Sequence, residues 1–152
     1  MGKCREALKL FLLLISLIVS VLEIDDSMAQ SNMIVVPDDF PTIQEAIDDA
    51  DEGGTIFVRS GNYFENLVIN KSIYLTGENP NTTIIDGNYA QVNNVVEVKS
   101  DNVKITGFTI QKSGGVKYYE RAGIYIDDSN SNNISYNMIA DNYGNGIRLE
   151  GS

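Results

Sequence analysis

The 152-residue sequence has few residues whose types and spacing could do chemistry, and most of these are carboxylates. The strand-like segment over residues 123–126 ends in the adjacent pair Asp127 and Asp128. Adjacent residues of a strand point to opposite faces, so these two side chains would not act together unless the backbone bends between them. Carboxylates paired for sugar hydrolysis must instead come from neighbouring segments that face a common groove. The candidates for such a groove are Asp127, Glu97, Glu150 and, as a basic residue, Arg148. For any one of them, a solvated outer face is the simpler interpretation.

The residue types also limit the metals and cofactors that the chain could hold. It contains no His and a single Cys, Cys4, while Met33 and Met138 lie far apart in sequence. Copper prefers imidazole or sulfur ligands, so we do not expect a copper site. Carboxylates leave Ca²⁺ as the metal to consider, because Ca²⁺ takes oxygen ligands. We therefore predict no catalytic residue, no metal ligand and no bound cofactor, with Ca²⁺ as the alternative.

Residues 1–29 have the features of a secretory signal peptide in the expected order. Basic residues come first, an apolar run over residues 10–22 follows, and Ser27 and Ala29 supply small residues before a cleavage point. A membrane-spanning helix needs about 20 apolar residues, so this run is short for an uncleaved anchor, which is the alternative interpretation. We predict removal of residues 1–29, a linker over residues 30–35 and a mature domain over residues 36–152. Such a protein is secreted, periplasmic or held at the cell surface, with no stable membrane span after cleavage.

The net charge of the chain limits the classes of partner that it could bind. The sequence has 11 Lys and Arg residues against 21 Asp and Glu residues, a net charge of −10. Such a surface repels nucleic acid phosphates and anionic lipids, so we expect no nucleic acid partner. Neutral sugars, divalent cations and basic surfaces are compatible partners, although solubility is the simplest explanation of the charge.

Residues 42–50 carry the convincing helical pattern of the chain. Thr42 and Glu45 fit a capping box, in which each side chain accepts a hydrogen bond from a backbone N–H at the helix start. The apolar residues recur with helical spacing on one face, at Ile43, Ala46, Ile47 and Ala50. Two glycines at positions 53 and 54 end the helix. Two turns are too short to be stable alone, so the apolar face must pack against another element.

Short apolar strands separated by polar breaks fill the rest of the chain. We predict strands over residues 55–58, 67–69, 72–75 and 82–85, with breaks at residues 60–62, 70–71, 77–81 and 86–88. Further along, residues 75–77 match 105–107, residues 105–110 match 134–139, and residues 123–126 match 146–149. The offsets between the matched segments are similar but unequal, which indicates one repeat with insertions.

A repeat of this length cannot bury an apolar face alone, so successive repeats must stack as coils with their inward side chains in columns. The predicted columns join Leu75 with Ile105 and Ile134, Ile110 with Ile139, Ile124 with Ile147, and Ile126 with Leu149. Asn tolerates left-handed backbone at a corner, and its amide can bond the amide of an Asn in the next coil. The predicted members of this structural ladder are Asn133, Asn137, Asn142 and Asn145.

Residues 40–47, 61–66, 75–77 and 83–87 resemble the opening of pectin-lyase-like β-helix proteins. The pattern Asn-Ile-x-x-Asn-x-Ile over residues 133–139 is similar to the NosD-type (CASH) repeats of periplasmic and archaeal cell-surface proteins. The resemblance implies an all-β, right-handed parallel β-helix with a short N-terminal cap helix, and binding or cleavage of sugar polymers in many members. The opening also resembles that of pectin methylesterases, but their Gln-Asp-Thr-Leu and Asp-Phe-Ile-Phe-Gly motifs do not occur in this sequence.

Three functions stay open at this point. We favour an exported cell-surface or periplasmic module that binds or scaffolds carbohydrate without catalysis. The first alternative is a fragment of a polysaccharide lyase, hydrolase or pectin-esterase-like enzyme. The resemblance implies that such a lyase uses Ca²⁺ held by Asp and Glu, together with a basic residue near the substrate. In this sequence Arg121, Arg148 or Lys99 could serve as that basic residue, and no feature selects one of them. The second alternative is a purely structural envelope protein.

The C-terminal end of the sequence adds one expectation about partners. Residues 149–152 follow an inward strand directly, with no polar cap or closing helix after it. Unpaired strand edges and a bare apolar end invite association. We expect a β-helix that is truncated here, whose open coil associates with further coils or with another chain.

Overall fold

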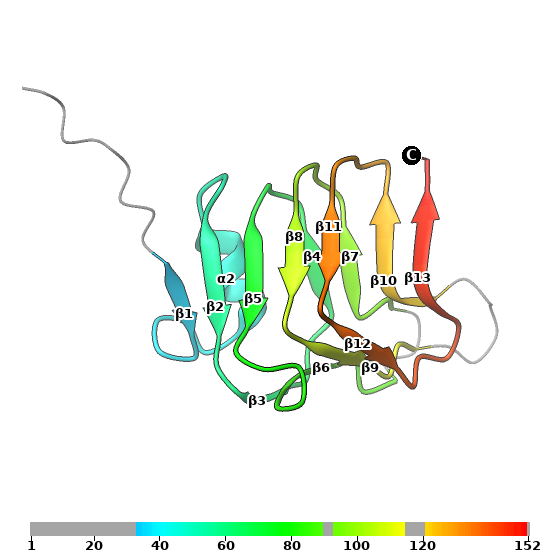
Figure 1. Ribbon diagram of the computed structural model, residues 1–152, viewed down its shortest axis with the longest axis horizontal. Helices are drawn as coiled ribbons and strands as arrows, with labels where there is room; N and C mark the ends of the chain where they lie inside the picture. The colour runs from blue at the N-terminus through cyan, green and yellow to red at the C-terminus, as the bar shows by residue number, and fades with distance from the viewer. Residues whose placement is uncertain (1–32, 90–92, 115–120, 152) are drawn as a thin grey trace, which may run out of the picture. The chain divides into compact units, whose positions relative to one another are not determined.

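The computed structural model describes residues 33–89, 93–114 and 121–151. The predicted signal peptide over residues 1–29 lies outside this part of the chain. The described residues form short strands and one short helix, α2, which confirms the all-β class (Figure 1).

The strands build three parallel sheets, which we call A, B and C. Sheet A contains β1 (Ile34–Val36), β2 (Thr55–Val58), β5 (Tyr74–Gly77), β8 (Lys104–Thr106) and β11 (Asn133–Ser135). Sheet B contains β3 (Gly61–Tyr63), β6 (Thr83–Asp86), β9 (Thr109–Gln111) and β12 (Met138–Ala140). Sheet C contains β4 (Leu67–Ile69), β7 (Val96–Val98), β10 (Ala122–Asp127) and β13 (Asn145–Glu150).

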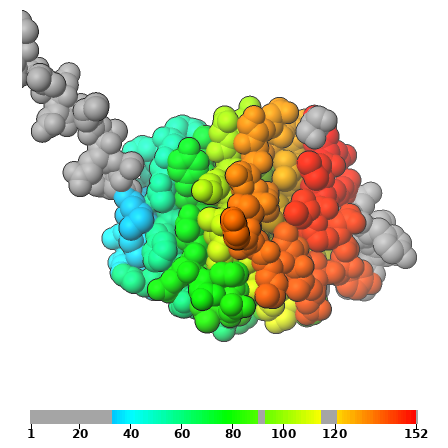
Figure 2. Space-filling model, in the orientation of Figure 1, coloured from blue at the N-terminus to red at the C-terminus, as the bar shows by residue number. Residues whose placement is uncertain are grey.

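The chain visits sheets A, B and C in turn, and each round is one coil of a parallel β-helix. Coil 1 is β2–β3–β4, coil 2 is β5–β6–β7, coil 3 is β8–β9–β10 and coil 4 is β11–β12–β13. The colours of Figure 2 run in chain order along the stack, so segments one coil apart in sequence are neighbours in space.

The predicted columns are confirmed by the strand register. The paired residues are Leu75 with Ile105 and Ile105 with Ile134, Ile110 with Ile139, Ile124 with Ile147, and Ile126 with Leu149. Leu75, Ile105, Ile110 and Ile124 are all 0% exposed. The columns therefore form the hydrophobic core inside the coils.

Several predicted boundaries need correction. Residues 60–62, predicted as a break, lie mostly in β3, because β6 offers Gly61–Tyr63 a parallel partner. The strand predicted over residues 72–75 is displaced to β5, and that over residues 82–85 is displaced to β6. β1 begins at Ile34 and pairs with β2. In each case a neighbouring coil supplies hydrogen bonds that local sequence cannot reveal.

The predicted helix forms as α2 (Ile43–Asp49), with Thr42 as its N-cap. Thr42 Oγ1 accepts from the backbone N–H of Glu45 at 3.2 Å, which is one of the two bonds of the predicted capping box. The carboxylate of Glu65, from coil 1, accepts from the N–H groups of Ile43 and Gln44 at 3.0 and 2.9 Å. At the other end, Lys71 Nζ donates to the carbonyl oxygens of Asp48 and Ala50 at 2.6 and 2.8 Å. Both helix termini are thus capped by residues that flank β4.

The helix covers the outer edge of β4, the first strand of sheet C. The side-chain amide of Gln44 donates to Val68 O at 3.2 Å and accepts from Val68 N at 2.9 Å, as a neighbouring strand would. Ile43, Ala46 and Ile47 are buried beneath the helix. The apolar face of α2 therefore packs against the coils, as expected for a helix too short to be stable alone.

The corners between the sheets follow a repeated pattern. Left-handed residues stand at Asn102, Gly107 and Lys112 in coil 3, and at the equivalent positions Ser131, Tyr136 and Asp141 in coil 4. The residue after each corner of coil 4 is an Asn whose Oδ1 accepts a backbone N–H of coil 3. The bonds run from Val103 to Asn132 (2.8 Å), from Phe108 to Asn137 (3.0 Å) and from Ser113 to Asn142 (2.9 Å).

This arrangement corrects the predicted Asn ladder. Asn137 and Asn142 also donate to Ile105 O and Ile110 O, at 2.8 and 3.1 Å, so their amides bond the backbone of the preceding coil rather than another Asn. Their own φ angles are not left-handed, because the preceding residue makes the turn. Asn133 and Asn145 are exposed strand residues that hold to coil 3 through their backbone N–H groups.

Candidate functional site

The outer face of sheet C collects the predicted groove residues. Side chains at alternate positions of each strand point outward, and the register aligns them across the strands. One row joins Val68, Glu97, Tyr125 and Arg148, and the next row joins Asp127 and Glu150. Glu97, Asp127, Glu150 and Arg148 come from three different coils and lie on one face.

Tyr125 is the centre of this face. Its hydroxyl donates to Glu150 Oε2 at 2.8 Å and lies 3.3 Å from Asp127 Oδ1. The guanidinium carbon of Arg148 stands 5.4 Å from the centre of the Tyr125 ring, a cation–π distance. Arg148 also donates to Glu150 Oε2 at 2.9 Å. These contacts hold a ring, a cation and two carboxylates in fixed relative positions.

Glu97 extends the face towards a small polar cavity. Lys99 Nζ lies 3.0 Å from Glu97 Oε1, and both side chains are partly exposed. A cavity of about 150 Å³ opens at the start of β4 and β7, lined by Glu97 together with Asn66, Asn93 and Arg121. Asn66 and Asn94 form part of its wall and link the coils, since Asn66 Nδ2 donates to Asn94 O and Asn94 Oδ1 accepts from Ala122 N, both at 2.8 Å. The polar surface therefore runs from Arg121 across Glu97 to Tyr125 and Glu150.

The pKa values of the groups on this face determine which of them act as hydrogen-bond donors. The hydrogen bond to Glu150, reinforced by burial and by the charge of Asp127, raises the pKa of Tyr125 to about 12. Its hydroxyl is therefore a neutral donor at physiological pH. The hydrogen bond and charge of Glu97 raise the pKa of Lys99, which keeps that ammonium charged. The face thus presents carboxylate acceptors and cationic donors side by side, the groups that hydrogen-bond sugar hydroxyls.

The sequence identified four residues of this face and missed its centre. Tyr125 alternates with Asp127 along β10, while Ile124 and Ile126 point inward, and this period of two could have placed Tyr125 beside Asp127. The expected separation of Asp127 from Asp128 holds, although the backbone does bend there. Asp128 has a φ of 42°, so the chain leaves the strand at that residue and Asp128 is exposed beyond the face.

The described residues hold neither a metal cluster nor a membrane span. Within residues 33–89, 93–114 and 121–151, no group of three or more His, Cys, Asp or Glu side chains lies close enough together to hold a metal ion. Within the same residues, no helix has the length and apolar character needed to cross a membrane.

Comparison with known proteins places these features in a family. Residues 42–152 match a family described as the right-handed β-helix region. A curated relative, the cell surface glycoprotein of Methanothermus fervidus, is 34% identical over 114 residues, which cover 74% of this chain and 18% of the relative. The chain therefore spans less than a fifth of the length of that relative. No solved structure matches the chain significantly.

Proposed function

This chain belongs to the right-handed β-helix family, and we propose that it is an exported cell-surface module that binds polysaccharide on the outer face of sheet C without cleaving it. One observation carries the proposal: Glu97, Tyr125, Asp127, Arg148 and Glu150 converge on that face from three coils. The similarity to a cell surface glycoprotein supports the location. The finer resemblance to NosD-type repeats and pectin-lyase-like proteins is part of the same proposal.

The geometry of the face favours binding of a hydroxyl-rich polymer. A flat sheet surface offers a long contact to an extended chain, and planar side chains such as Tyr and Arg pack against sugar rings. The contacts among Tyr125, Arg148 and Glu150 order these side chains before any ligand arrives. Less side-chain entropy is then lost on binding. With a net charge of −10, the chain suits neutral polymers better than strongly acidic ones.

The same contacts argue for binding rather than turnover. A hydrolase needs one carboxyl group as a general acid and a second as base or nucleophile, placed on either side of the scissile bond. Here Asp127 and Glu150 face a single phenolic hydroxyl, and Glu97 and Glu150 each have a cationic partner. The acidic side chains are thus engaged in ordering the face.

The test is binding of the full chain to a glycan array, followed by calorimetric titration with the polysaccharides that bind. Replacing Tyr125 by Ala removes the ring under Arg148 and the donor to Glu150, so we expect affinity to fall at least tenfold. Tyr74→Ala is the matched control, because Tyr74 is 46% exposed in β5 of sheet A, away from this face.

Three outcomes would contradict parts of the proposal. Equal loss in both Tyr variants would show that the outer face of sheet C is not the binding site. Release of new reducing ends or unsaturated sugars by the full chain would favour the lyase or hydrolase alternative. Silence on the array, together with ordered assembly of the protein, would favour a purely structural envelope role.

A further inference from the structure

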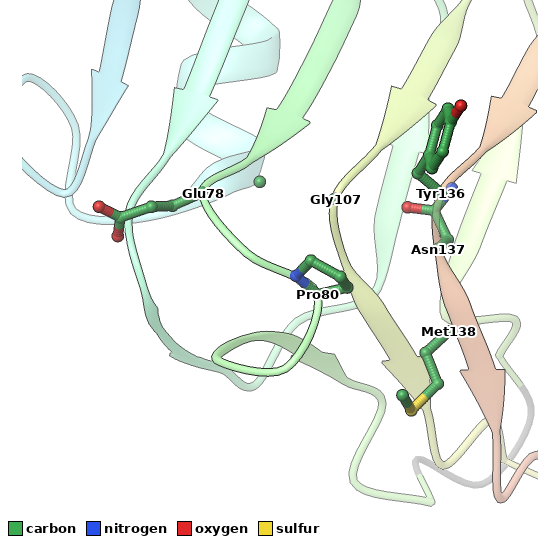
Figure 3. Close-up of a pocket in the computed structure, with 7 residues that line it drawn as sticks. Glu78, Pro80, Gly107, Tyr136, Asn137 and Met138 are labelled. Carbon is green, nitrogen blue, oxygen red and sulfur yellow. The ribbon is translucent and has the colours of Figure 1, made fainter.

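A second concave surface lies at the corner where sheet A passes into sheet B, away from the face described above. It is a cavity of about 390 Å³ that crosses coils 2, 3 and 4. Its lining includes Gly77, Glu78 and Pro80 from coil 2, Gly107 from coil 3, and Tyr136 and Met138 from coil 4. Figure 3 shows Pro80 on one side of Gly107 and Tyr136, Asn137 and Met138 on the other, with the side chains of Tyr136 and Met138 pointing in different directions and Glu78 extending away from them.

The floor of the cavity is bare backbone for a steric reason. A Cβ atom at Gly77 would overlap the carbonyl oxygen of Gly107, and a Cβ atom at Gly107 would overlap that of Gly77. Gly107 also has a φ of 84°, which L-residues rarely adopt. Glycine is therefore the residue that the fold itself requires at this corner.

Coil 4 departs from this rule at one residue. Tyr136 follows Ser135 as Gly107 follows Thr106 in the paired strand, and it has a φ of 55°. Its side chain is 87% exposed, so it contributes little burial in return for its strained backbone. A large ring at a position suited to glycine raises one wall of the cavity, and the side chains of Pro80 and Met138 complete an apolar lining.

The backbone groups that link coils 3 and 4 at the cavity are already hydrogen-bonded to each other. Gly107 N donates to Tyr136 O at 3.2 Å, Met138 N donates to Phe108 O at 2.8 Å, and Asn137 accepts from Phe108 N. An extended peptide could therefore not insert between coils 3 and 4 at this corner, because these groups already bond each other. An apolar ring face, in contrast, needs no backbone partner.

Charge narrows the occupant further. The charged residue of the lining is Glu78, which accepts from Ser60 N at 2.7 Å, and that hydrogen bond holds its pKa below the usual value. A carboxylate at the margin of the cavity, on a chain of net charge −10, repels uronates and other acidic sugars.

We infer that this corner binds the apolar face of a neutral pyranose ring, stacked on Tyr136 and flanked by Pro80 and Met138. The site is separate from the outer face of sheet C. A failure of binding at that face would therefore not count against binding at this corner.

The experiment is a two-dimensional ¹H–¹⁵N NMR titration of the full chain with cellohexaose, maltohexaose and mannohexaose, and with an oligogalacturonate as the acidic control. We expect at least one neutral hexaose to shift the amide signals of Gly77, Gly107 and Tyr136, and the oligogalacturonate to leave them unchanged. Tyr136→Phe should keep affinity within about threefold, since the ring remains.

Tyr136→Gly is the decisive variant. It restores the residue that stands at this corner in coils 2 and 3, so the unfolding midpoint should stay equal or rise while affinity at the corner falls at least tenfold. Tyr143→Ala removes a 59% exposed ring elsewhere in coil 4 and should change neither quantity. Unchanged corner shifts in Tyr136→Gly would overturn the inference. So would Tyr136-dependent binding of the oligogalacturonate, or no corner shift with any neutral hexaose up to its solubility limit. Loss of array binding in Tyr125→Ala, with the corner shifts unchanged, would support a corner site that is separate from the outer face of sheet C.

Discussion

The two ends of the described coil stack differ in how they bury the apolar columns. At the first end, β1 pairs with β2 and α2 covers β4, so Val36, Ile43 and Ile47 are each 0% exposed. At the other end, no described strand pairs with the outer edges of β11, β12 and β13. The side chains of Met138, Ile147 and Leu149 there are 48%, 43% and 61% exposed.

Residues of similar type in one column differ in burial according to the coil in which they lie. Ile124 and Ile147 occupy one column, one coil apart, yet they are 0% and 43% exposed. Ile126 and Leu149 are 6% and 61% exposed in the same way. Residues of similar type thus contribute unequal burial, because a coil is buried only when something stacks on both of its sides.

The largest effect should follow from truncating a covered column. Replacing Ile124 by Ala leaves a cavity among packed neighbours and should lower the free energy of unfolding by about 2–5 kcal/mol. Replacing Ile147 by Ala in the uncovered coil should cost less than about 1 kcal/mol, because that side chain is already half exposed. Urea unfolding followed by circular dichroism measures both. Equal losses would show that coil 4 is covered in solution and would break the comparison.

The buried carboxylate of Asp86, which bonds coil 2 to coil 3, should make the free energy of unfolding depend strongly on pH. Asp86 of coil 2 is 3% exposed, and its carboxylate accepts from Lys112 Nζ at 2.7 Å, Gln111 Nε2 at 2.8 Å and Asn88 N at 2.8 Å. Burial alone would raise the pKa of Asp86, but the hydrogen bonds from Lys112 and Gln111 outweigh it and lower the pKa below the usual value. Asp86→Asn should cost about 1–3 kcal/mol at neutral pH.

The sign of the pH effect follows from the lowered pKa. The stabilisation by Asp86 is complete above the pKa of an unfolded Asp, about 3.9, and is lost as the pH falls through the lower folded value. The free energy of unfolding of the parent chain should therefore fall between about pH 5 and pH 2, by an amount of the same order as the cost of Asp86→Asn. In Asp86→Asn the corresponding part of this fall should disappear, and an unchanged acid limb would exclude this junction as its source. Asp49→Asn, at an exposed position of α2, is the control.

Sequence reasoning predicted the coils because the relevant signals repeat along the chain. The match of residues 123–126 to 146–149 places Ile124 opposite Ile147, and the match of residues 105–110 to 134–139 places Ile110 opposite Ile139. Extending the first match along the strand sets Asp127 opposite Glu150, so part of the candidate face was predictable. Alternation along one strand and repetition between strands are enough for this level of detail.

Other features depend on contacts that no local pattern records. Gly61–Tyr63 has little strand character and becomes β3 because β6 pairs with it. The left-handed corner residues of coil 4, Ser131 and Tyr136, belong to types that do not mark such a conformation. The role of Tyr125 depends on the directions of Arg148 and Glu150, which are set by packing and not by spacing.

A smaller effect should come from the contact that closes the first end. Gln44→Ala removes the amide that donates to and accepts from Val68, and should cost about 1 kcal/mol. Gln44→Glu keeps the acceptor for Val68 N but loses the donor to Val68 O, so its cost should be intermediate. Hydrogen exchange at the Val68 amide reports the change locally. Protection that is unchanged in Gln44→Ala would mean that α2 covers β4 through its apolar face alone.

The smallest effect on stability should occur at the uncovered end, where association is the more sensitive measurement. Ile147→Ser and Leu149→Ser together should change the free energy of unfolding by less than about 1 kcal/mol, since the two residues are already 43% and 61% exposed. An exposed apolar end with unpaired strand edges favours pairing with a further coil or another chain. We therefore expect the double variant to lower concentration-dependent association in sedimentation velocity, while Val68→Ser, 38% exposed on the covered strand β4, leaves it unchanged. Equal association in all three proteins would locate self-contact elsewhere, and the difference between the two ends would then be one of burial alone.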